Sequence, residues 1–235
     1  MQIRLVESGR KFSQANKDEL TEFLLKLPSS HLDSIKTIER IKTLGGALAD
    51  SSSFGDGGEI RLPNFFYELS KTEREFVFLH EMGHNYFDFR DENEGDMHQI
   101  LKTTPCEREN VSHLLRIQWM ELGLWELNAE NFEKVKALDP ENRANRDKYT
   151  YAVMYKDPNY KMGEWTCSEE AKIPQDSFKL GFNYNDFYSP KEEMADAYAL
   201  FVLERDYFLE FVEKSKLIKA KFDFIQKCFI DNTQI

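Results

Sequence analysis

The segment His80-Glu81-Met82-Gly83-His84 contains the residues best suited to chemistry. Two histidines four positions apart lie on the same side of a helix, about one turn from each other. Both imidazoles can therefore reach a single tetrahedral Zn²⁺ ion. Glu81, beside His80, is placed to take a proton from the attacking water and pass it to the leaving amine. The spacing is the HExxH pattern, which predicts a hydrolytic zinc site.

Such a site needs a third protein ligand and an open position. A further histidine at position 90 would complete one common extension of the pattern, but this chain has Arg90 there. Glu192 and Asp196 are better candidates, because they lie four apart on a predicted helix and so share one side of it. We expect Glu192 to bind the metal and Asp196 to accept the free ring N–H of a ligand histidine.

A purely structural explanation of Glu192 also exists. Ser189 and Glu192 have the spacing of a capping box, which would explain this glutamate without any metal. A capping box does not require Asp196, however, nor the small residue Ala195 beside it, which would let this helix pack closely on another. Glu192 is therefore the favoured ligand, and two substitutes remain open, Glu193 and His98.

The helix that carries the histidines is well defined by its sequence. Ser70 and Glu73 form a predicted capping box at its start. Phe76, Leu79 and Gly83 then recur at helical spacing. A glycine inside a helix costs about 1 kcal/mol relative to alanine. Its presence here predicts that another element approaches the helix closely at Gly83.

Other elements follow from hydrophobic periodicity and turn residues. Helices are predicted over residues 13–27, 191–204 and 217–229, and a strand over 35–41, while the polar run 49–58 indicates turns. A short strand before Pro63 is predicted to lie at a sheet edge, because proline cannot donate to a neighbouring strand. An extended peptide could add to that edge. The residues expected to bind it are Gly58, Glu59, Ile60, Arg61 and Leu62.

Composition indicates an ordinary folded protein. Of 235 residues, 41% are hydrophobic and 31% charged, which suits one folded domain. The net charge of −11 disfavours nucleic acid as a partner. No apolar run is long enough for a membrane span. Three scattered cysteines and the absence of a leader-like segment favour the cytoplasm, with secretion or delivery into a host cell as the alternative.

The two motifs together resemble a known family. HEMGH followed much later by EEMADAYALFV is similar to the gluzincin peptidases, and within them to the lethal-factor-like group, which includes the Pro-Pro endopeptidases. The second motif of that group is a glutamate, three residues, an acidic residue, an alanine and an aromatic, here Glu192, Asp196, Ala197 and Tyr198. The resemblance implies an α+β, zincin-like fold, with a small mixed sheet packed on the HExxH helix. It also implies zinc-dependent endopeptidase activity. Measured against that family, the single domain divides into an N-terminal part (1–88), a large insertion (89–188) and a helical C-terminal part (189–235).

In that family a tyrosine shortly before the third ligand stabilises the oxyanion. The resemblance therefore assigns this role to Tyr184 or Tyr188. The expected partner is a protein or peptide substrate, and the sequence indicates no oligomeric state. Two alternatives stay open: a zinc-binding regulatory protein without turnover, and a partner-recognition protein in which the histidines are structural.

Overall fold

The chain combines a small mixed sheet with two groups of helices. The computed structural model describes residues 3–45, 47–52, 57–93, 119, 122, 126–127, 165–166, 170–171, 173 and 190–230. The predicted α+β class is confirmed, with a mixed sheet of four strands. The division at residues 89 and 189 stays a prediction, because most of 89–188 lies outside the described ranges.

The described helices and strands fall into an N-terminal group and a later group. The N-terminal part contains β1 (Arg4–Glu7), α1 (Gln14–Leu24), α2 (Ser29–Leu32), β2 (Ile35–Ile41), β3 (Asp50–Ser52), β4 (Gly58–Pro63), the 3-10 helix η1 (Asn64–Glu68) and α3 (Lys71–Asn93). The later described elements are β5 (Glu126–Leu127), β6 (Trp165–Thr166), α8 (Pro190–Leu203), α9 (Arg205–Val212) and α10 (Lys216–Ile230).

The sheet has the strand order β1-β2-β4-β3. β1, β2 and β4 run parallel, and β3 runs antiparallel to β4. β4 is thus paired on both sides, and the prediction of an edge strand at Gly58–Leu62 is wrong. Pro63 is the last residue of β4, so its missing N–H does not restrict the residues before it. The edge strand beside β4 is Asp50–Ser52, in a segment predicted as turns.

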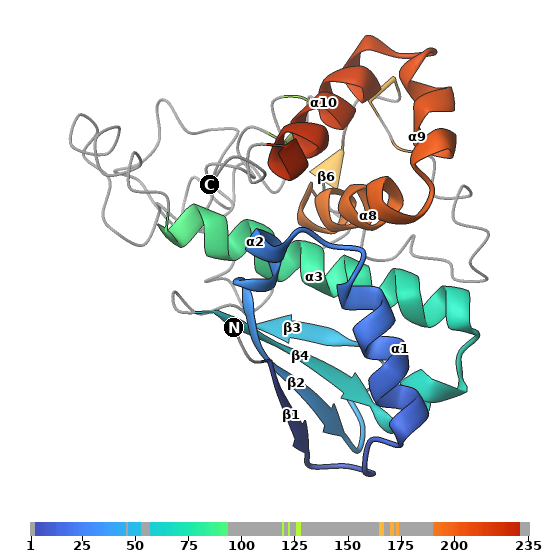
Figure 1. Ribbon diagram of the computed structural model, residues 1–235. Helices are drawn as coiled ribbons and strands as arrows, with labels where there is room; N and C mark the ends of the chain where they lie inside the picture. The colour runs from blue at the N-terminus through green and yellow to red at the C-terminus, as the bar shows by residue number, and fades with distance from the viewer. Residues whose placement is uncertain are drawn as a thin grey trace.

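α3 is the central helix of the molecule. The predicted capping box is confirmed, because Glu73 N–H donates to Ser70 Oγ (3.3 Å) and Ser70 N–H donates to Glu73 Oε2 (2.7 Å). Every residue from position 75 to position 87 is buried. Figure 1 shows the reason: α3 passes between the sheet on one side and the group α8–α10 on the other. A helix covered on two sides is buried around most of its circumference.

The C-terminal helices agree with the predicted ranges. α8 and α10 occupy nearly the residues expected, whereas α9 is an addition, separated from α8 by the non-helical Glu204 (φ −135°, ψ 48°). Residues 193–200 of α8 are all buried. No helix in the described ranges is long and apolar enough to cross a membrane.

His31 of α2 joins the helix layers. Its ring stacks on Tyr86 of α3, with centroids 4.0 Å apart, and its Nδ1 lies 2.7 Å from the hydroxyl oxygen of Tyr198 in α8. Its Nε2 lies 3.1 Å from the carbonyl oxygen of Cys228 in α10. His31 is completely buried, so these contacts help to hold α3, α8 and α10 in one arrangement.

Candidate metal centre

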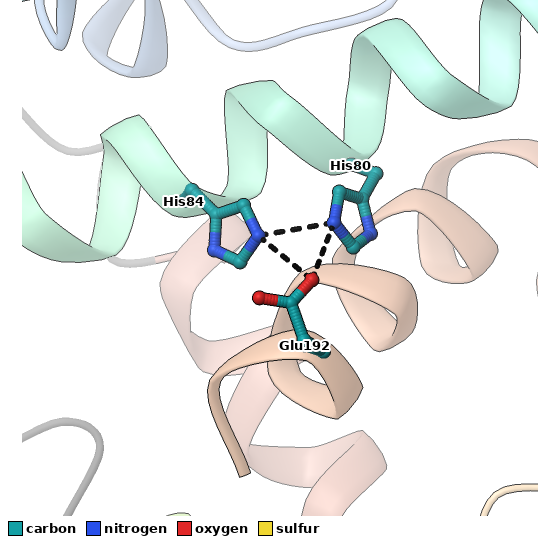
Figure 2. Close-up of side chains that lie close together, drawn as sticks. All are labelled: His80, His84 and Glu192. Carbon is teal, nitrogen blue, oxygen red and sulfur yellow. Dashed lines mark hydrogen bonds and ion pairs between the residues drawn. The ribbon is translucent and has the colours of Figure 1, made fainter. Parts of the chain in front are cut away.

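His80, His84 and Glu192 converge at the contact between α3 and α8. The Nε2 atoms of the two histidines are 3.0 Å apart, and their ring centroids are 4.6 Å apart. Glu192 Oε2 lies 3.1 Å from Nε2 of His80 and 3.4 Å from Nε2 of His84. Figure 2 shows the two rings descending from α3 and the carboxylate rising from α8 to meet them. The three side chains could hold a metal ion.

The hydrogen bond behind His80 shows that this donor set suits a cation. Nδ1 of His80 lies 2.7 Å from Oδ1 of the buried Asp196. An ionised carboxylate can only accept, so Nδ1 of His80 carries a proton and Nε2 is directed to the cluster. Nε2 faces a second imidazole nitrogen and a carboxylate oxygen at short range. Three such electron-rich atoms repel one another unless a positive charge, either a shared proton or a metal ion, lies between them.

The pKa directions indicate the same preference. Burial lowers the pKa of His80, but Asp196 and Glu192 outweigh burial and raise that pKa well above its ordinary value. Burial raises the pKa of Glu192, yet His84 and His80 outweigh it and hold that pKa well below its ordinary value. Burial also raises the pKa of Asp196. An environment that favours a protonated imidazole beside an ionised glutamate also suits a bound cation.

The close approach of α3 and α8 depends on two small residues. A Cβ atom built on Gly83 would lie 3.1 Å from Cα of Ala195 and 3.1 Å from Cβ of Tyr198. Both distances are tighter than ordinary van der Waals contact, so hydrogen is the only side chain that fits without movement. The approach of another element, predicted from the glycine, is confirmed. It brings Glu192 within reach of the histidines.

Glu81 lies in α3 directly after His80. Its exposed fraction is 8%, close to that of the two histidines. One step along a helix turns the side chain by about 100°, so Glu81 lies on the flank of the histidine face rather than on it. This placement separates it from the three convergent ligand atoms. Its role in chemistry stays a prediction.

Glu193 does not belong to the cluster, so this substitute ligand is excluded. Its carboxylate accepts hydrogen bonds from Lys221 (2.5 Å), Trp119 (3.0 Å) and the N–H of Ile173 (3.2 Å). These partners belong to α10 and to the central part of the chain. His98, Tyr184 and Tyr188 lie outside the described residues, so their predicted roles stay predictions.

Sequence reasoning missed the partner of Glu193, although a signal was present. Lys221 shares its helix face with Ile218, Phe222 and Ile225, which are all buried in α10. A lysine on an apolar helix face requires a buried acceptor, because an unpaired ammonium in the core is very unfavourable. That requirement could have assigned one of the two adjacent glutamates of α8 to Lys221.

Comparisons of this chain with protein-family models, with curated proteins and with solved structures found no match. The fold and the site therefore define the class: an α+β protein with a candidate metal centre between two packed helices. Any finer assignment depends on the chemistry of the site itself.

Proposed function

We propose that the protein is a zinc-dependent endopeptidase of the gluzincin type with a zincin-like fold. The observation that carries the proposal is the convergence of His80 and His84 of one helix with Glu192 of another, more than 100 residues further on. The presence of a glutamate, Glu81, directly after the first histidine adds to the support for this proposal. A site used only for structure would not need a carboxylate beside an open coordination position.

The donor set favours zinc over other common ions. Imidazole nitrogens suit zinc, whereas calcium and magnesium take mainly oxygen ligands. Three protein ligands from nitrogen and carboxylate oxygen are typical of catalytic zinc sites, whereas structural sites usually have four. A bound Zn²⁺ supplies Lewis acidity, which makes a water more acidic and a carbonyl group more electrophilic.

The residues of the chain divide the remaining work. Asp196 holds the proton on Nδ1 of His80 and thereby fixes which nitrogen faces the ion. Glu81 takes a proton from the attacking water and returns it to the leaving amine. Tyr184 or Tyr188 donates to the oxygen on which negative charge develops.

Because β4 is not an edge strand, the proposed site of substrate binding is the edge strand β3 instead. β3 lies at the edge of the sheet and also contacts α3, the helix with the histidines. An extended peptide aligned with Asp50–Ser52 would add a strand to the sheet through main-chain hydrogen bonds. In this arrangement the residues of β4 support the edge strand from inside the sheet and do not bind the peptide.

The test compares two buried glutamates of α3. Glu81→Gln should lower kcat/KM on a peptide library by about 10²–10⁴-fold, the usual contribution of a general base, while zinc stays bound. Glu75→Gln is the matched control, because Glu75 is also 8% exposed but pairs with Lys26 away from the cluster. It should leave the rate nearly unchanged.

The outcomes separate the three functions considered. Full activity in Glu81→Gln would contradict the proposed mechanism. Tight zinc binding by the natural chain without cleavage of any library peptide would instead support the regulatory protein. Failure to bind zinc at all would leave recognition of a partner, with His80 and His84 as structural residues.

A further inference from the structure

Glu193 is the centre of a second buried cluster, directly behind the metal site. Lys221 is completely buried, and Glu193 is 1% exposed. Nζ of Lys221 donates to Oε2 of Glu193 (2.5 Å) and to the carbonyl oxygen of Ala171 (2.7 Å), and it lies 5.1 Å from the ring centre of Trp119. Trp119 Nε1–H donates to the same oxygen of Glu193, at 3.0 Å.

Glu192 and Glu193 are adjacent but point in different directions. Successive residues of an α-helix are rotated by about 100°, so α8 presents Glu192 to α3 and Glu193 to α10. Asp196, four residues after Glu192, returns to the metal side. Any rotation of α8 about its axis would move all three carboxylates together.

The contacts of Glu193 oppose such a rotation. Its Oε1 accepts from the main-chain N–H of Ile173, and its Oε2 accepts from Lys221 and Trp119, so both oxygens are held from separate directions. Charge-assisted hydrogen bonds in a buried setting are short and directional. A buried ion pair is weak evidence for stability, but it can specify one arrangement among several.

We propose that Glu193 is a positioning residue for the metal centre. Its bonds to Lys221, Trp119 and Ile173 set the rotation of α8 at which Glu192 and Asp196 face the histidines. Docking of Trp119 and Ile173 thereby couples the central part of the chain to metal affinity. The inference rests on the proposed function only in requiring that the site binds a metal.

The experiment measures metal affinity in folded variants by competition with a chromogenic chelator, using Zn²⁺ and Co²⁺. Glu193→Gln and Lys221→Met should each weaken zinc affinity by about tenfold, the lower end of the effect of outer-sphere partners. Trp119→Phe keeps an aromatic ring but removes the indole N–H donor, while the bond from Lys221 remains, so a loss below about tenfold is expected. The visible absorption bands of bound Co²⁺ should shift in each variant, because those bands report coordination geometry.

A double variant separates positioning from folding. Glu193→Gln with Lys221→Met buries no unpaired charge, so its melting temperature should recover relative to the single variants. Its zinc affinity should stay about tenfold weaker, because the charge-assisted bonds remain absent. Ile38→Ala, a cavity in the sheet at a fully buried position, is the control that lowers the melting temperature without changing affinity or the cobalt spectrum.

The zinc affinities of the four variants decide whether Glu193 has the positioning role. Zinc affinity within twofold of the natural chain in all four variants would overturn the positioning role, as would an affinity that recovers together with the melting temperature in the double variant. If a single variant fails to fold, Trp119→Phe and the double variant still give the answer. A natural chain that binds neither Zn²⁺ nor Co²⁺ would overturn the proposed function, and this inference with it.

Discussion

The two helices of the candidate site are specified in different ways. α3 contributes two nitrogens through residues one turn apart, and its own capping box fixes where it begins. α8 contributes one oxygen and the support of His80, and its orientation depends on contacts with other elements. Half of the site is thus encoded locally, and half arises only when the chain has folded.

Each contact of α8 involves a different part of the molecule. Ala195 lies against Gly83 of α3, Tyr198 bonds to His31 of α2, and Glu193 bonds to Lys221 of α10. We therefore expect distant substitutions to disturb the oxygen side of the site more than its nitrogen side. Substitutions in the two helices test that difference, and the largest effect is expected at the ligands themselves.

Removal of a ligand should have the largest effect and should not distinguish the helices. His84→Ala and Glu192→Ala should each weaken zinc affinity by more than about 100-fold, because a direct ligand contributes more than an outer-sphere partner, whose loss costs about 10–100-fold. Chelator competition checks this, with Asp206→Asn on the exposed surface of α9 as the control. Unchanged metal content in Glu192→Ala would mean that the oxygen ligand is assigned wrongly.

Loss of the support behind His80 should have the next largest effect. Asp196→Ala should weaken zinc affinity by about 10–100-fold, because Nδ1 of His80 loses its acceptor and the ring loses its fixed orientation. Asp196→Asn should retain part of the affinity, since the amide oxygen can still accept from Nδ1–H. Equal affinities in the two variants would argue against a hydrogen-bonding role for this residue.

Local patterns were sufficient for the α3 side of the site. The HExxH spacing, the capping box of Ser70 and Glu73, and the internal Gly83 are all short-range signals, and the structure confirms the cap and the close approach at the glycine. The pairing of Asp196 with His80 was also foreseen, because two carboxylates four apart share one side of a helix.

Tertiary context decided what the sequence could not predict. The proline at the end of β4 favours an edge strand when the neighbouring strands are unknown. The strand that pairs with β4 on that side, Asp50–Ser52, is too short and polar to be recognised in the sequence. The choice between Glu192 and Glu193 required knowledge of Lys221, which lies 28 residues later in another helix. The apolar face of α10 indicates that Lys221 needs a buried acceptor, but which of the two glutamates it contacts depends on which helix faces meet in space.

The contact between the two helices should respond moderately to an added methyl group. Gly83→Ala places a Cβ at 3.1 Å from the backbone of Ala195, and overpacking of this kind costs about 1–3 kcal/mol. The better helix propensity of alanine offsets about 1 kcal/mol of that cost. Denaturant unfolding should show a net loss, together with weaker zinc affinity as Glu192 moves away from α3.

A substitution at the facing position of α8 is the control for that contact. Ala195→Gly opens space instead of filling it and should cost only about 1 kcal/mol through helix propensity. Its zinc affinity should therefore fall less than that of Gly83→Ala. A Gly83→Ala variant with natural stability and natural affinity would show that the helices can move apart freely, and would remove the physical reason given for this glycine.

The smallest effect is expected at the start of α3, where the cap acts locally. Ser70→Ala should lower the free energy of unfolding by about 1 kcal/mol and leave zinc affinity unchanged, because His80, the nearer of the two histidines, lies ten residues further along.

The side chain and the N–H of Ser70 hold the pKa of Glu73 below its ordinary value of 4.5. A lowered folded-state pKa stabilises the protein above pH 4.5, and this contribution is lost as the pH falls through the lower value. The natural chain should therefore be more stable than Glu73→Gln at neutral pH, and this advantage should disappear in acid. If Ser70→Ala weakened zinc binding as much as Asp196→Ala does, the α3 half of the site would not be locally encoded after all.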